Sequence, residues 1–188
     1  MKRAVFLLAA LCCAPPACVA DTAATREHFA PPGYETAYHE WHYTPVLRVG
    51  ETVIVSGIPA AGPGSYEDKV RRMFGELRKQ LELAGASLDD VVELTSFHVQ
   101  PNDSKSFQEE FKRFGAIHHE FFPSHYPAWS AVGTTALLSP GAVVEMRALA
   151  VIGSGRAAKA DIPPPKARPQ PAAAPSPSQA PAQQLISG

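Results

Sequence analysis

VVEMRALAVI, the stretch from Val143 to Ile152, decides the fold of this chain. The side chains of a strand alternate between two faces, so Glu145 shares one face with Arg147, while Met146 lies on the other. Apolar residues occur on both of these faces, which is typical of a strand that is buried on both sides. The stretch therefore predicts a sheet that is covered on each of its two faces.

Four more segments have the composition of strands. Thr44–Val49 and Glu51–Ile58 are rich in β-branched residues and meet at Gly50, which predicts a hairpin. Leu88–Val99 and Pro127–Thr135 are the third and fourth strands in chain order. The sequence thus predicts five strands in all.

Two amphipathic helices are predicted between these strands. The first begins at Ser65, has apolar residues three or four apart from Val70 to Ala84, and ends at Gly85. The second begins within residues 104–106 and ends before Pro123. The order is therefore β-β-α-β-α-β-β, an α+β fold with one mixed sheet and two helices on one face. Since two helices cover one face only, we expect another subunit to cover the second.

A secretory signal peptide is predicted over residues 1–20. Lys2 and Arg3 precede an apolar run from Ala4 to Cys13, and small residues precede a cleavage point after Ala20. The run is too short to span a bilayer, so we expect no membrane span and a periplasmic or secreted protein. All three cysteines lie in this leader, so we expect no disulfide in the mature chain. Lipid attachment to one of them stays an alternative that the neighbouring residues fit poorly.

Proline and alanine dominate the other end of the chain. From Ile162 the sequence reads IPPPKARPQPAAAPSPSQAPAQQLISG, which has too few large apolar residues to offset the entropy lost on ordering. We therefore expect a Pro/Ala-rich disordered tail over residues 154–188. A lead-in over residues 21–37 and one globular domain over residues 38–153 complete the predicted organisation.

Charge and motif content argue against several classes of function. Without Lys2 and Arg3 the chain keeps 15 of its 17 basic residues against 18 acidic ones, which gives no electrostatic case for binding nucleic acid. His39 and His42 are three residues apart rather than the four of a zinc-binding HExxH helix, so we predict no metal site. The serines form no nucleophile motif such as GxSxG.

Three segments together resemble the RidA/YjgF family. They are VGETVIVSGIPA (49–60), LELAGASLDDVVELTSFHV (81–99) and PAWSAVGTTALLSPGAVVEMRALAV (127–151), and the resemblance covers residues 43–152. The form YPAWSAVG is most similar to the YjgH-type branch. The resemblance implies a chorismate-mutase-like fold and a homotrimer with a small-molecule cleft at each subunit interface. It also implies hydrolysis of reactive enamines and imines to 2-keto acids and ammonia, with no metal or organic cofactor.

The resemblance also implies which residues line the cleft. Tyr43 and Ser56 fall where the family has a cleft tyrosine and a cleft serine. Glu145 falls on the carboxylate that activates or positions water, and we expect it to be catalytic. Backbone N–H groups near Ser130 and Ala131 would steady developing negative charge.

Trp129 is the main departure from the family pattern. The family has an arginine at this place in a PAR(S/T) motif, where it clamps the substrate carboxylate, and the family's cleft cysteine is Ala131 here. An indole carries one N–H donor, no charge and a large apolar face. We therefore expect Trp129 to line the cleft, 2-aminoacrylate to be a poor substrate, and the cleft to prefer an uncharged or aromatic ligand.

Arg147 lies on the same strand face as Glu145, two residues away. It would either lower the pKa of Glu145, replace the missing arginine, or form an ion pair at the subunit interface, and the sequence favours the last interpretation. The leading hypothesis is a hydrolytic deaminase of altered specificity. The alternative is a non-catalytic trimer that only binds a small molecule.

Overall fold

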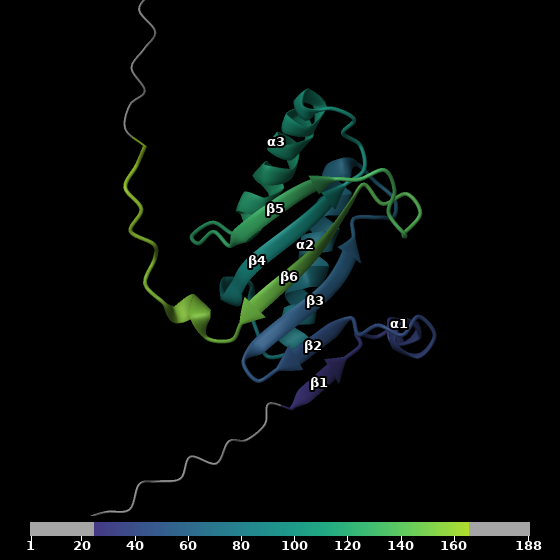
Figure 1. The fold of residues 1–188 in the computed structure, drawn as a ribbon, viewed down its shortest axis with the longest axis vertical. Coiled ribbons are helices and arrows are strands. Elements are labelled where there is room, and N and C mark those ends of the chain that lie inside the picture. The colour runs from purple at the N-terminus through teal and green to yellow at the C-terminus, as the bar shows by residue number, and fades with distance from the viewer. Residues whose placement is uncertain (1–24, 166–188) are drawn as a thin grey trace, which may run out of the picture.

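A six-stranded mixed sheet forms the centre of the computed structural model, which describes residues 25–165 (Figure 1). Its strand order is β1-β2-β3-β6-β4-β5, and every pairing is antiparallel except that between β4 and β5. This confirms the predicted α+β class and mixed sheet. The strands are β1 (Arg26–Phe29), β2 (Val46–Val49), β3 (Thr52–Pro59), β4 (Val91–His98), β5 (Ala128–Gly133) and β6 (Val144–Val151).

Two long helices pack on one face of the sheet. These are α2 (Tyr66–Leu83) and α3 (Ser104–Phe121), and Figure 1 shows α2 lying behind the strands. Ser65 caps α2 in a reciprocal capping box with Asp68, as the sequence indicates. The cap of α3 is Asp103 rather than a serine, and its carboxylate accepts the backbone N–H of Ser106 at 2.8 Å.

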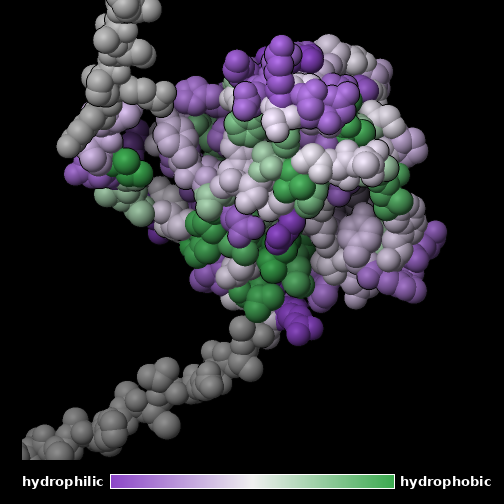
Figure 2. Space-filling view, turned by 45° about the horizontal axis from the view of Figure 1, so that its top comes forward, coloured by the Kyte–Doolittle hydropathy of each residue, from purple (hydrophilic) through white to green (hydrophobic). Residues whose placement is uncertain are grey.

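The hydrophobic core lies between these helices and the sheet. On β6 the residues alternate strictly: Val144, Met146, Ala148 and Ala150 are buried against the helices, and the residues between them are half-buried. The second sheet face, which we call the open face, carries apolar residues next to polar ones: Ile54, Phe97, Val132, Glu145, Arg147 and Leu149. In Figure 2 apolar residues reach the surface in patches between hydrophilic ones.

Two parts of the described chain differ from the predicted domain limits. Upstream of residue 38, β1 pairs with β2, and a short helix, α1 (Glu35–His39), follows it. Downstream of residue 153, a 3-10 helix at Ser154–Arg156 occupies the start of the predicted tail. It is held by Asp90, from the 3-10 helix at Leu88–Asp90, whose carboxylate accepts the N–H groups of Gly153 and Gly155. The predicted signal peptide and residues 166–188 of the tail lie outside the described residues.

Within residues 25–165, no helix combines the length and apolar character that crossing a membrane requires. In the same range, no group of three or more histidine, cysteine, aspartate or glutamate side chains is arranged to hold a metal ion.

Candidate functional site

Glu145 lies on the open face of β6, between two apolar neighbours. Its partners across the ladder are Pro59 on β3 and Phe97 on β4. Burial among such neighbours raises the pKa of the Glu145 carboxyl above its ordinary value. The carboxyl of Glu145 also lies directly against Gly57, where any larger side chain would overlap it. Gly57 belongs to a bulge of β3 between Val55 and Ile58, so the bulge makes room for the carboxylate.

Ser56 is hydrogen-bonded to the segment that carries Tyr43. Ser56 directly precedes Gly57, and its hydroxyl donates to the carbonyl of Thr44 at 2.7 Å. That bond fixes the chain next to Tyr43, whose side chain is 41% exposed. The structure therefore places Ser56 next to Gly57, against which Glu145 lies, and joins Ser56 to the residue that follows Tyr43. The Ser56 hydroxyl proton is already engaged, so this oxygen is left as an acceptor.

Arg147 has a different partner from the ones considered in the sequence analysis. Its guanidinium lies 3.7 Å from the carboxylate of Glu93 on β4, and both side chains are well exposed. The interpretation that Arg147 lowers the pKa of Glu145 is wrong, because burial shifts that pKa upward. The pair with Glu93 forms within one chain, and such an exposed pair contributes little to stability.

Trp129 lies on the opposite face of the sheet from Glu145. It pairs in register with the buried Leu94, which turns its ring toward α3. There the indole lies between aromatic rings, with centroids 4.6 Å from Phe111 and 4.7 Å from His118. Trp129 and Glu145 therefore do not meet within one protomer.

Ser130 and Ala131 are divided between the two faces in the same way. Ser130 is exposed and pairs with Thr95 on the open face, next to Arg147 in the ladder. Ala131 turns to the helix side and lines a pocket of about 510 Å³. A site that uses both groups of residues would have to join the open face of one protomer to the pocket of another.

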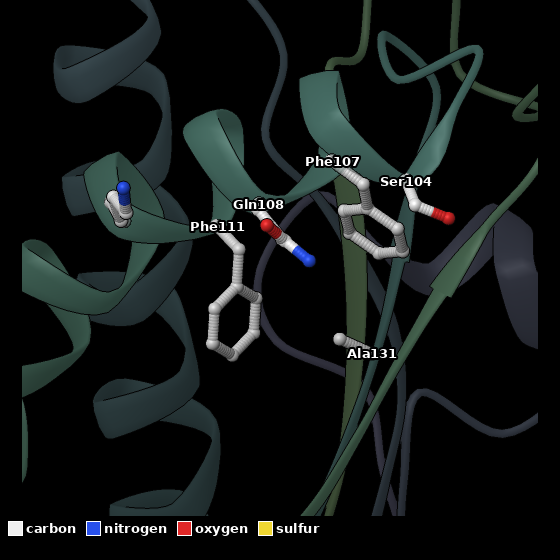
Figure 3. Close-up of a pocket in the computed structure, with 6 residues that line it drawn as sticks. Ser104, Phe107, Gln108, Phe111 and Ala131 are labelled. Atoms are coloured by element: carbon white, nitrogen blue, oxygen red, sulfur yellow. The ribbon is translucent and has the colours of Figure 1, made fainter. Parts of the chain in front are cut away.

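The pocket lies between α3 and the edge strand β5 (Figure 3). Phe107 and Phe111 are one helical turn apart and face Ala131. Gln108 and Lys112 also line the pocket with the same spacing, and their exposure places them at its rim. Two aromatic faces with an amide and an ammonium group suit a flat ring that carries a polar substituent. The sequence analysis missed this pocket, although the two (i, i+4) pairs within the second helix were its signal.

A mixed sheet with two helices on one face, and a carboxylate held against a bulge on the other, defines a class of small α+β domains. Comparison with known families agrees with that class. Residues 35–152 match the model of the family described as Endoribonuclease L-PSP, and the chain belongs to this family, which includes the RidA/YjgF proteins. The predicted family is thereby confirmed.

Three known proteins illustrate the similarity. RutC family protein YjgH of Escherichia coli (strain K12) is 32% identical over 111 residues, which are 56% of this chain and 80% of YjgH. A 2-iminobutanoate/2-iminopropanoate deaminase of Dermatophagoides farinae is 31% identical over 117 residues, or 58% of this chain and 85% of that protein. The crystal structure of Rv2704 from Mycobacterium tuberculosis, of the YjgF/YER057c/UK114 family, gives a TM-score of 0.58 at 26% identity. That similarity covers 68% of this chain and all of Rv2704.

Proposed function

We propose that this chain is an exported, cofactor-independent hydrolase that deaminates imine- or enamine-type small molecules. The observation that carries the proposal is the half-buried carboxyl of Glu145, which has a raised pKa and lies against Gly57. The similarity of the chain to an imine deaminase supports the reaction class. The predicted leader supports export to the periplasm or the exterior.

The reaction needs one acid–base group and a water molecule. An enamine first tautomerises to an imine, and water then adds across the C=N bond while the Glu145 carboxylate accepts a proton from that water. The proton passes to nitrogen, the C–N bond of the carbinolamine breaks, and the products are a carbonyl compound and ammonia. A carboxylate whose pKa lies nearer to neutrality is a stronger general base than an ordinary one. The burial of Glu145 between Pro59 and Phe97 therefore suits it to this role.

Assembly would complete the site. The open face exposes apolar residues such as Val132, which is 43% exposed in the single chain. A sheet face of this composition favours contact with another subunit. We propose a homotrimer in which the Glu145 surface of one protomer meets the pocket beside Ala131 of the next, with the ligand between them.

The specificity would differ from that of an enzyme that clamps a carboxylate. Trp129 supplies no charge, and its N–H is already used within the chain. Arg147 is paired with Glu93, so it is not a free cation on the open face. Losing a buried guanidinium–carboxylate contact costs on the order of 2–5 kcal/mol. Every 2-imino acid loses this contact equally, but an aromatic side chain can bind between Phe107 and Phe111, so an aromatic imine would be a better substrate than the small imine derived from alanine.

The test uses the leaderless chain and two imines generated in the cuvette by an amino-acid oxidase, from phenylalanine and from alanine. The disappearance of each imine is compared with its uncatalysed rate. Wild type accelerates the phenylalanine-derived imine more, and Glu145→Gln abolishes the acceleration. Glu82→Gln, which removes an exposed carboxylate of α2 on the other side of the sheet, is the control and keeps the rate. A Glu145→Gln protein as fast as wild type would refute the proposal.

A second candidate function is ligand binding without turnover. The pocket beside Ala131 is lined by Ser104, Phe107, Gln108, Phe111 and Lys112, which include no carboxylate or imidazole to act as a general base at neutral pH. A protein that binds aromatic molecules there, but accelerates neither imine, would be such a binding protein. The same assay with Glu145→Gln separates the two functions.

A further inference from the structure

A row of hydrogen bonds crosses the interior from α2 to the edge strand β5. The Tyr66 hydroxyl donates to Glu110 of α3, and Nδ1 of His98 lies 3.0 Å from the same Glu110 oxygen. On the other side of the ring, Nε2 of His98 lies 2.8 Å from Oγ of Ser96, and the Trp129 indole donates to that Oγ at 2.9 Å. We call these five residues the Trp129 relay. Ser96 and His98 are fully buried, and Glu110 is 6% exposed.

Two members of the relay, Trp129 and Glu110, fix the direction of its hydrogen bonds. The indole can only donate, and an ionised Glu110 can only accept. Ser96 therefore accepts from Trp129 and donates its own proton to Nε2 of His98, whose Nδ1–H donates to Glu110. Every proton points toward the carboxylate, although its second oxygen, Oε2, makes no hydrogen bond of its own and lies 2.8 Å from Nδ1 of His98. A buried chain of hydrogen bonds that runs in one direction restricts the packing of the side chains around it.

The relay supports both aromatic walls of the pocket. The Phe107 ring lies 5.1 Å from that of His98, and the Phe111 ring lies 4.6 Å from that of Trp129. Phe107 and Phe111 thus each rest on a ring that the relay holds in place. Their separation over Ala131 depends on hydrogen bonds that neither phenylalanine makes.

Ser96, His98 and Glu110 have the order of a nucleophile, a base and a carboxylate, but their burial argues against that chemistry. Ser96 has no exposed surface, and the indole of Trp129 donates to its oxygen. A nucleophile must reach the reacting atom. The structure therefore favours a role for these residues in positioning rather than in catalysis.

We infer that Ser96 and His98 are positioning residues that set the spacing of Phe107 and Phe111, so that the pocket selects a flat aromatic ring with an anionic or polar substituent. Gln108 and Lys112 at the rim would receive that substituent. The inference rests on the proposed function in one respect, that this pocket belongs to the ligand cleft. Its test does not require any turnover.

The test compares Ser96→Thr with Ser96→Val in a Trp41→Phe background, so that Trp129 is the sole tryptophan of the chain. Threonine and valine have nearly the same shape, and only threonine keeps the hydroxyl. Benzoate is the probe, with cyclohexanecarboxylate as its non-aromatic counterpart, and affinities are measured by NMR titration. We expect Ser96→Thr to bind benzoate like its parent and Ser96→Val to bind it about ten-fold more weakly, the effect of leaving a buried polar partner unmatched. Trp129 fluorescence should shift in Ser96→Val alone.

Further variants identify the route of the effect. If Ser96 acts through the indole N–H, adding Trp129→Phe should remove the difference between the threonine and valine proteins. Ser96→Ala serves as a smaller substitution should the valine protein fail to fold, and thermal melts of all variants verify folding. Equal benzoate affinity in folded Ser96→Thr and Ser96→Val proteins would overturn the positioning role. Equal affinity of the parent for benzoate and cyclohexanecarboxylate would overturn the ligand class. If the parent chain hydrolyses no imine, the proposed function is refuted. If the Ser96→Val protein nevertheless binds benzoate more weakly than the Ser96→Thr protein, this inference still stands.

Discussion

The imidazole of His118 stacks on the indole of Trp129, with ring centroids 4.7 Å apart and planes inclined by 15°. A second ring, Phe122, stacks on the imidazole from the C-terminal end of α3 at 4.8 Å. Burial between these rings is the main reason that the pKa of His118 falls to about 4. The nearby His119 and His125 lower this pKa further. The folded protein therefore keeps this histidine neutral under conditions in which an unfolded chain would protonate it.

The stability of the protein should fall in acid because of His118. The unfolded chain takes up a proton near pH 6.5, whereas the folded chain resists it down to about pH 4. The contribution is thus complete above pH 6.5 and is lost progressively as the pH falls toward 4, on the order of 3 kcal/mol in all. His118→Phe keeps the stacking and should reduce this pH dependence. Urea unfolding at pH 7 and pH 5, at one protein concentration, measures it.

The exposed His39 of α1, which does not contribute to the pKa of His118, provides the control for that experiment. His39→Gln should leave the pH dependence of the free energy of unfolding close to that of wild type. If His118→Phe loses stability between pH 7 and pH 5 as steeply as wild type does, another group carries the effect.

The activity should depend on pH through Glu145. A general base works only when it is deprotonated, and burial raises the pKa of this carboxyl above the ordinary 4.5. The acidic limb of the rate profile should therefore have its midpoint above pH 4.5, with activity rising as the pH increases. The profile of imine hydrolysis between pH 4 and pH 8 measures this midpoint. A limb centred below pH 4.5 would show that Glu145 is not the group that titrates.

Gly57 should be required for the position of the Glu145 carboxylate, the proposed general base. A methyl group at residue 57 would overlap the Glu145 side chain, so Gly57→Ala must push the carboxylate away from the bulge. We expect imine hydrolysis to fall at least about ten-fold, since misplacement by roughly 1 Å is costly in catalysis. The control is Gly75→Ala in α2, where an added methyl meets no atom within 4 Å. That variant should keep its activity and gain about 0.5–1 kcal/mol of stability.

Asp90 should anchor the end of the domain. Burial alone would raise its pKa, but hydrogen bonds from Gly155, Ser87 and Gly153 lower it, so the carboxylate stays ionised and bonded. Asp90→Ala leaves these donors without their acceptor and should lower the free energy of unfolding by on the order of 2 kcal/mol. Asp89→Ala, at the exposed neighbour, should change it by less than about 0.5 kcal/mol. Similar losses in both variants would contradict the anchoring role.

Much of the fold follows from the sequence because its strands and helices have clear periodicity. β3 and β6 are rich in branched apolar residues, and α2 and α3 carry stripes that match one helical face. β1 has no such signal, since its four residues are mostly exposed and are held by backbone pairing with β2. Hydrophobic periodicity reports which side chains are buried, so it does not detect a strand that is held by backbone hydrogen bonds alone.

The site was predictable only in part for a related reason. Alternation along β6 put Glu145 on the face of Arg147 and opposite Met146, and the structure leaves the Glu145 face without helices. The environment of Trp129 depends on the register between β4 and β5, which no local pattern encodes. Ser96 and His98 were visible as two polar residues on the buried face of a strand, but their partner Glu110 comes from α3. The contact between His98 of β4 and Glu110 of α3 forms only when the helix packs on the sheet, so neither segment of sequence predicts it.

The anchoring of Ser154–Arg156 by Asp90 has a practical consequence for attaching the protein to a surface. Glu145 and Val151 stand near opposite ends of β6, about 20 Å apart by the rise of a strand. A linker joined after Arg156 would therefore leave from the end of the sheet remote from the carboxylate. Immobilisation through that end should leave the end of the sheet that carries Glu145 turned away from the support.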